Sequence, residues 1–232
     1  MKKIVLLGIF SAAMAFVEAT VVYYLRKLYY PENVMFPINI SAIPSEILAI
    51  EWVREACTII MLLVVAILIG KKFQDKFAYF IYCFAVWDIF YYIWLKIILG
   101  WPQSLLTWDI LFLIPVTWIS PVLAPILVSC TMIALALIII KYLPFKINFW
   151  EWLLLIASAT FLYISFVWDF SLLILKEGFL VRFSGLTLSP TLLNSISGFT
   201  PTTYHWDIFI LAEILACVAI FSFLRRTKKS ET

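Results

Sequence analysis

The sequence predicts an all-α, polytopic membrane protein with six transmembrane helices. Of its 232 residues, 65% are hydrophobic and only 13% are charged, and the mean hydropathy is +1.05. A soluble domain of this length cannot bury so much apolar surface. Continuous apolar runs of about 20 residues, long enough to cross the hydrocarbon core of a bilayer, recur along the chain. Because these runs are continuous rather than alternating, a β-barrel is excluded.

Six apolar runs are long enough to span a membrane, and all belong to one predicted membrane domain covering residues 1–232. We expect the spans at about residues 4–25, 47–69, 77–99, 108–140, 149–175 and 204–224. The connections at 70–76 and 142–148 are short. The stretches 26–46 and 176–203 are longer, and prolines mark them as irregular backbone.

The first span opens with two lysines, a short apolar core and small residues at Ala13 and Ala15, a pattern that resembles a secretory signal peptide. The apolar run nevertheless continues to Leu25, so we expect an uncleaved first helix. This helix carries Glu18 at membrane depth. Glu18 has no basic residue within four positions, which makes it a candidate for a functional site.

Charged residues also crowd one face of the second span and enter the third. Glu51, Arg54 and Glu55 are three and four positions apart, so their side chains share a helix face. This triplet is either a solvated helix start or part of a site. In the third span we expect Tyr92 to hydrogen-bond Asp88, one turn away, and Arg54 to pair with Asp88 across the bundle. Such a buried pair either fixes helix packing or serves a site.

The fourth span contains Pro115, Pro121 and Pro125, which cannot all lie in one straight helix. Each proline removes a backbone donor and clashes with the preceding turn. We therefore expect an outer half-helix over residues 108–114, a break near 115–121 and then a full span. Backbone without helical hydrogen bonds at membrane depth must be buried in protein or line a cavity, so we expect the break to border a pocket. A kinked helix is the alternative.

Tryptophan directly precedes aspartate four times, at Asp88, Asp109, Asp169 and Asp207. Asp109 and Asp207 fall in predicted first turns of helices, where the helix dipole favours a carboxylate and tryptophan anchors the membrane interface. Asp88 and Asp169 lie deeper in their spans, as does Glu213 in the sixth. A charge in hydrocarbon costs at least about 2.5 kcal/mol and normally faces a bundle interior or a wet cavity.

The distribution of basic residues predicts that both termini are cytoplasmic and that the protein lies in the cell membrane, plasma or inner. With this orientation the cytoplasmic segments carry 11 of the 17 basic residues and only three acidic ones, as the positive-inside rule requires. The intramembrane acids then occupy the outer halves of the spans, and the inner halves carry no charge. This favours an outward-facing pocket with an apolar floor over a transport pathway, which needs polar groups across the membrane.

The residue inventory limits the chemistry. His205 is the only histidine, so a bis-histidine haem site and a His-rich zinc or di-iron site are excluded. The four cysteines lie far apart without CxxC spacing, and we expect them to be buried free thiols. We expect no metal, no cofactor and no nucleic-acid partner. Aromatic walls over an acidic pocket suit a cationic or amphipathic ligand.

The leading interpretation is a binding protein whose pocket takes a small cationic or amphipathic ligand, a lipid headgroup or a partner helix from another membrane protein. The candidate ligand-binding residues are Glu18, Glu51, Arg54, Asp88, Tyr92, Asp109, Trp118, Asp169, His205, Asp207 and Glu213. The first alternative is an enzyme acting on a lipid or lipid-linked substrate at the outer leaflet. Its acid–base candidates are Asp88, Asp169, His205 and Glu213. Further alternatives are an accessory subunit of a membrane complex and a cation-coupled transporter.

Overall fold

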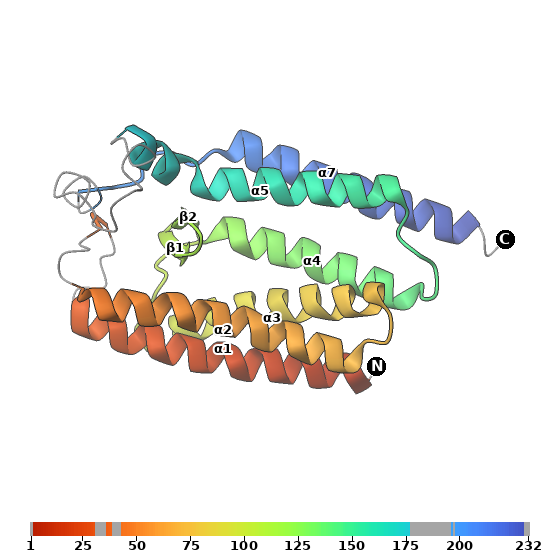
Figure 1. The fold of residues 1–232 in the computed structure, drawn as a ribbon, viewed down its shortest axis with the longest axis horizontal. Helices are drawn as coiled ribbons and strands as arrows, with labels where there is room; N and C mark the ends of the chain where they lie inside the picture. Colours follow the sequence, from red (N-terminus) through yellow and green to blue (C-terminus); the bar gives the residue numbers. More distant parts are fainter. Residues whose placement is uncertain (1, 31–35, 39–42, 177–195, 197, 230–232) are drawn as a thin grey trace.

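Six long apolar helices dominate the computed structural model, which describes residues 2–30, 36–38, 43–176, 196 and 198–229 (Figure 1). They are α1 (Lys2–Tyr29), α2 (Ser45–Ile69), α3 (Phe73–Leu99), α4 (Leu123–Lys141), α5 (Phe149–Lys176) and α7 (Trp206–Lys229). Each is long and apolar enough to cross a membrane. The predicted all-α, multi-pass fold with six transmembrane helices is therefore confirmed.

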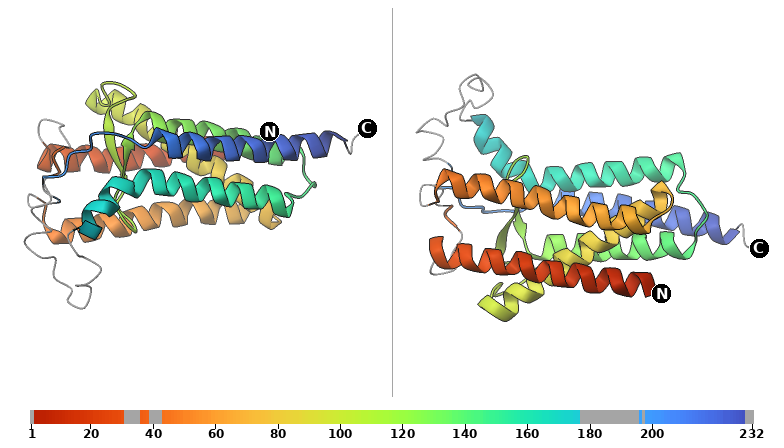
Figure 2. Two further views of the ribbon diagram at one scale, coloured as in Figure 1. Left: turned by 90° about the horizontal axis from the view of Figure 1, so that it is seen from above. Right: turned by 60° about the horizontal axis from the view of Figure 1, so that its bottom comes forward.

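The helices form two groups that α4 joins. α1 and α2 both pack against α3, α5 packs along α7, and α4 contacts α3 on one side and α7 on the other (Figure 2). Both termini lie at the same end of the bundle (Figure 1), as an even number of spans requires. The opposite end, where α1 ends and α2 begins, is called the far end below.

Small residues allow α1 and α3 to pack closely. Ala15 and Ala19 on α1 are fully buried, and the Nε1 of Trp94 on α3 donates to the carbonyl oxygen of Ala12 at 2.9 Å. In a bilayer, small residues at helix contacts allow the backbones to approach and gain dispersion energy. This contact places the middle of α1 directly beside α3.

The predicted half-helix at the start of the fourth span is wrong, although the predicted break is confirmed. β1 (Trp108–Phe112) pairs antiparallel with β2 (Trp118–Pro121), and α4 begins only at Leu123. Prolines at 115 and 121 remove backbone donors and favour extended backbone just before them. The hairpin instead satisfies the backbone by cross-strand hydrogen bonds. It lies at the far end of the bundle (Figure 1).

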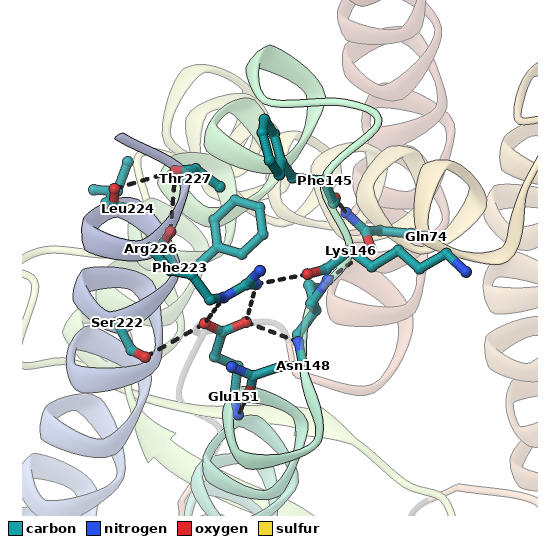
Figure 3. A network of polar contacts seen from close by, with 11 residues as sticks. Gln74, Phe145, Lys146, Asn148, Glu151, Ser222, Phe223, Leu224, Arg226 and Thr227 are labelled. Carbon is teal, nitrogen blue, oxygen red and sulfur yellow. Dashed lines mark hydrogen bonds and ion pairs between the residues drawn. The ribbon is translucent and has the colours of Figure 1, made fainter. Parts of the chain in front are cut away.

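A polar network locks the helices at the end that holds the termini (Figure 3). Glu151 and Asn148 form a capping box at the start of α5, each side chain accepting the other's backbone N–H at 2.8 Å. Glu151 is 1% exposed and also lies 2.8 Å from the Nη2 of Arg226 on α7. Gln74 of α3 donates to the carbonyl oxygen of Phe145 in the α4–α5 connection. The ion pair therefore joins α5 to α7, and the Gln74 amide joins α3 to the connection between α4 and α5.

The four cysteines are free thiols, as expected. Only Cys83 is buried, whereas Cys57, Cys130 and Cys217 are exposed on the protein surface. The expectation that all four are buried is therefore wrong for three of them. Their helices present those faces outward, where a thiol behaves as a small apolar group.

Candidate functional site

A cavity of about 170 Å³ lies at the far end among α1, α2, α3 and β1. Its volume resembles that of an engineered cavity that holds benzene, so it fits a small molecule or the head of a larger one. Seven charged residues line it, contributed by all four elements: Glu18, Arg26, Glu51, Arg54, Glu55, Asp88 and Asp109. Five of the candidate acids and bases from the sequence, together with Tyr92, therefore meet at one place.

Arg54 of α2 is held by two carboxylates. Its Nη2 lies 2.7 Å from Oε2 of Glu51, one turn away, and its Nη1 contacts Oε1 of Glu18 on α1. The hydroxyl of Thr58 donates to the other oxygen of Glu18 at 3.1 Å. The predicted pair between Arg54 and Asp88 is wrong, because α1 lies beside α2 on the surface of α3 and brings Glu18 to the guanidinium instead.

A second ion pair joins α1 to the hairpin. Nη2 of Arg26 lies 3.3 Å from Oδ1 of Asp109, and the Tyr92 hydroxyl donates to Oδ2 of Asp109 at 3.0 Å. The Arg26 guanidinium also lies over the Trp101 ring, 3.8 Å from its centroid. The side chains of Arg26 and Asp109 are 3% and 0% exposed, so water is excluded from the pair.

This arrangement corrects two expectations. Asp109 is not in the first turn of a helix, because it lies on β1 and the hairpin points its carboxylate into the bundle. Tyr92 donates to Asp109 on β1 rather than to Asp88, which lies one turn back on its own helix and accepts from Ser129. Asp109 therefore links α1, α3 and β1.

Asp88 and Glu55 have neutral partners. The Ser129 hydroxyl of α4 donates to Oδ2 of Asp88 at 2.8 Å. The backbone N–H of Leu113 lies 2.9 and 3.1 Å from the two carboxylate oxygens of Glu55, which thereby accepts a donor at the end of β1. In the described part of the chain, neither carboxylate forms an ion pair with a cation.

Aromatic and aliphatic side chains complete the wall. Trp87, Tyr91 and Tyr92 of α3 face the cavity from one side. Tyr30, just beyond the end of α1, also lines the cavity. Burial raises the pKa of its phenol more than nearby Arg26 lowers it, so the hydroxyl stays neutral. Towards the termini, an apolar core closes the bundle with buried residues that include Leu7, Leu62, Ala66 and Cys83.

The two remaining tryptophan-linked aspartates lie outside the cavity, near the start of α7. Oδ1 of Asp169 lies 3.3 Å from Nε2 of His205, and both side chains are partly exposed. Asp207 is in the first turn of α7 and its side chain is 82% exposed, which confirms the predicted helix start. These three candidates form a separate, more exposed cluster.

Glu213 and Trp118 also lie away from the cavity. The Thr131 hydroxyl of α4 donates to Oε2 of Glu213 on α7 at 2.6 Å, beside an apolar groove. Trp118 of β2 stacks on Phe166 of α5, with ring planes 17° apart. Of the four acid–base candidates, only Asp88 lines the cavity, so the four do not meet in one site.

The candidates chosen from the sequence omit Arg26 and Glu55. Arg26 falls in the predicted connection after Leu25, whereas α1 continues to Tyr29. The tyrosines that follow Arg26 could have indicated this longer helix. Tyrosines favour the membrane interface, so a charged residue that precedes them lies within the end of the span. Glu55 belongs to the triplet with Glu51 and Arg54, which the sequence left as either a solvated helix start or part of a site.

Comparisons with known proteins yield no relative from which a function could be transferred. No protein-family model, curated protein or solved structure matches this chain. Its function is therefore inferred from the cavity and from the charges that line it.

Proposed function

We propose that this protein is a membrane-embedded binding protein whose cavity takes a small amphipathic ligand with an ammonium group. The observation that carries the proposal is the charge imbalance of the cavity wall. Two guanidiniums face five carboxylates, those of Glu18, Glu51, Glu55, Asp88 and Asp109. An unpaired carboxylate inside a membrane bundle is costly, and a ligand ammonium would supply the missing positive charge.

The pairing within the wall identifies where the ammonium would bind. Arg54 contacts Glu18 and Glu51, and Arg26 contacts Asp109. Glu55 and Asp88 are the two carboxylates that form no ion pair with a cation among the described residues. We therefore assign the ammonium to the space that these two line, with the ring faces of α3 available for cation–π contact.

An organic cation suits this wall better than a metal ion does. Among the described residues, no three histidine, cysteine or acidic side chains are grouped closely enough to hold a metal. Aliphatic side chains of α1 and α2 line the same cavity and would accompany an alkyl chain, namely Val22, Leu25, Ile47 and Leu48. A cavity of about 170 Å³ also favours a small ligand over a partner helix, which is about 10 Å across.

We further propose that the cavity faces the outer side of the cell membrane and that both termini are cytoplasmic. The support is that both termini lie at one end of the bundle (Figure 1) and that the basic residues are concentrated in the segments of that end. The apolar core between the cavity and that end favours a binding site over a continuous transport pathway.

The experiment compares octylamine with 1-octanol, which has the same alkyl chain without the charge. Binding to the purified protein in a neutral detergent is measured by calorimetric titration. We expect octylamine to bind and 1-octanol to bind much more weakly. Glu55→Gln and Asp88→Asn should each weaken octylamine binding at least about tenfold, because a hydrogen bond to a charged group is worth about 1.5–3 kcal/mol.

Glu213→Gln is the matched control, because it neutralises a partly buried, hydrogen-bonded carboxylate that lies outside the cavity. It should leave octylamine binding unchanged. Equal binding of octylamine and 1-octanol would refute the proposal. So would affinities in Glu55→Gln and Asp88→Asn that match those of the wild type and of the control.

A further inference from the structure

The cavity wall holds three buried N–H groups that have no acceptor among the described residues. They are Nε and Nη1 of Arg26 and Nε1 of Trp87. Both side chains line the cavity, and the two residues are 3% and 4% exposed. A buried donor without an acceptor is costly, and native proteins rarely leave one unpaired. A bound molecule with acceptor oxygens would satisfy these groups.

The Arg26 side chain is held in place, while its Nε and Nη1 have no acceptor among the described residues. Its Nη2 is taken by Asp109, and the face of the guanidinium lies over the Trp101 ring. A fixed guanidinium with free N–H groups is well suited to bind an anionic, oxygen-rich group such as a phosphate. Trp87 precedes Asp88 on α3, and both residues line the cavity.

The cavity thus combines free donors with unpaired carboxylates. Glu55 and Asp88 suit a cation, whereas Arg26 and Trp87 suit an anion with several oxygens. α1 and α2 each pack against α3. The ion pair of Glu18 with Arg54 joins these two helices, and aliphatic side chains of both helices line the cavity. An acyl chain could leave the cavity along this apolar side.

We infer that the ligand is zwitterionic and carries the phosphoethanolamine group, with its phosphate on the free donors of Arg26 and Trp87 and its ammonium between Glu55 and Asp88. This inference rests on the proposed function and adds the anionic half of the ligand. The group is supplied either by a phospholipid head or by a soluble phosphoethanolamine compound.

The test measures four ligands on the full-length protein in neutral detergent: dihexanoyl phosphatidylethanolamine, glycerophosphoethanolamine, dihexanoyl phosphatidylglycerol and octylamine. The first should bind at least tenfold more tightly than octylamine, which lacks the phosphate, and than the phosphatidylglycerol, which lacks the ammonium. Binding of glycerophosphoethanolamine as tight as that of the lipid would identify a soluble source. Weaker binding would identify the lipid.

Trp87→Phe is the decisive variant, because it keeps an aromatic ring and removes only the indole N–H. It should weaken binding of the phosphatidylethanolamine about fivefold or more, and by a larger factor than it weakens binding of octylamine. Trp118→Phe is the matched control, since Nε1 of Trp118 is also buried without an acceptor among the described residues but lies outside the cavity. Arg26→Lys keeps the charge beside Asp109 and should weaken the same lipid more than octylamine.

Two outcomes would overturn the inference while leaving the proposed function intact. One is that octylamine binds as tightly as the phosphatidylethanolamine. The other is that Trp87→Phe, Arg26→Lys and Trp118→Phe all leave the affinity for this lipid unchanged. Failure of octylamine and of every phosphoethanolamine compound to bind would refute the proposed function itself.

Discussion

Replacement of Asp109 by alanine should be among the most destabilising single changes at the far end. The Asp109 side chain is 0% exposed and pairs with Arg26, which is 3% exposed. Removal of one partner of a buried ion pair leaves the other charge uncompensated and costs about 3–5 kcal/mol. The Tyr92 hydroxyl, which donates to Asp109 at 3.0 Å, also loses its acceptor, which places the expected loss at the upper end of that range.

The free energy of unfolding is measured by titrating the purified protein with a denaturing detergent and following its circular dichroism. Asp207→Ala is the matched control, because it also removes an aspartate after a tryptophan, but from a side chain that is 82% exposed. This control should lose only the helix-dipole contribution, about 0.3–1 kcal/mol. The double variant Arg26→Met/Asp109→Ala removes both charges and should be more stable than Asp109→Ala alone.

Two results would refute this reasoning. The first is a loss for Asp109→Ala that is no larger than the loss for Asp207→Ala. The second is a loss of stability in the double variant, relative to the wild type, that equals the sum of the losses in the single variants Arg26→Met and Asp109→Ala, since that would show that Arg26 and Asp109 do not interact.

Two further predictions concern the other end of the bundle and its orientation. Arg226→Ala should lower the free energy of unfolding by about 1–3 kcal/mol, because Glu151 stays buried without its ion-pair partner. Arg225→Ala, at the exposed neighbouring position, should change it by less than about 0.5 kcal/mol. Equal losses in the two variants would contradict the role of the ion pair. In a cysteine-free background on intact cells, Ser104→Cys at the far end should react with a membrane-impermeant maleimide and Lys71→Cys should not. The opposite labelling pattern would reverse the proposed orientation.

The number and positions of the helices could be predicted because each depends on a local property. An apolar run of membrane length forms a helix wherever it occurs, and the six described helices cover the predicted spans except at the start of the fourth. There the prolines correctly indicated a break. They did not indicate a hairpin, because strand pairing depends on two segments meeting, and residues 108–112 have the same apolar composition as a helix.

The partners of the charged residues could be predicted less well, because they depend on which helices are neighbours. Arg54 was expected to meet Asp88, the acid at a similar depth on the next helix. Instead α1 brings Glu18 to Arg54, and α4 brings Ser129 to Asp88. Depth in the membrane can be read from one span, whereas the face that a helix presents to each neighbour requires the packed bundle.

The four Trp-Asp pairs illustrate the same limit. Asp109 and Asp207 look alike in sequence, since both follow a tryptophan at a predicted helix start. One is fully buried in an ion pair on a strand, and the other is exposed at the start of α7. Asp88 is buried and lines the cavity, whereas Asp169 is partly exposed beside His205. The dipeptide therefore has no single role in this protein.

Photoaffinity labelling with an octylamine that carries a diazirine tests the central claim most directly, because it locates the bound ammonium compound on the chain. The labelled residues are mapped by mass spectrometry with and without excess unlabelled octylamine. We predict labelling of cavity-lining peptides from α1, α2, α3 and β1 that excess octylamine suppresses. Labelling that octylamine does not suppress, or that is confined to the apolar groove beside Glu213, would contradict a binding site at the far end.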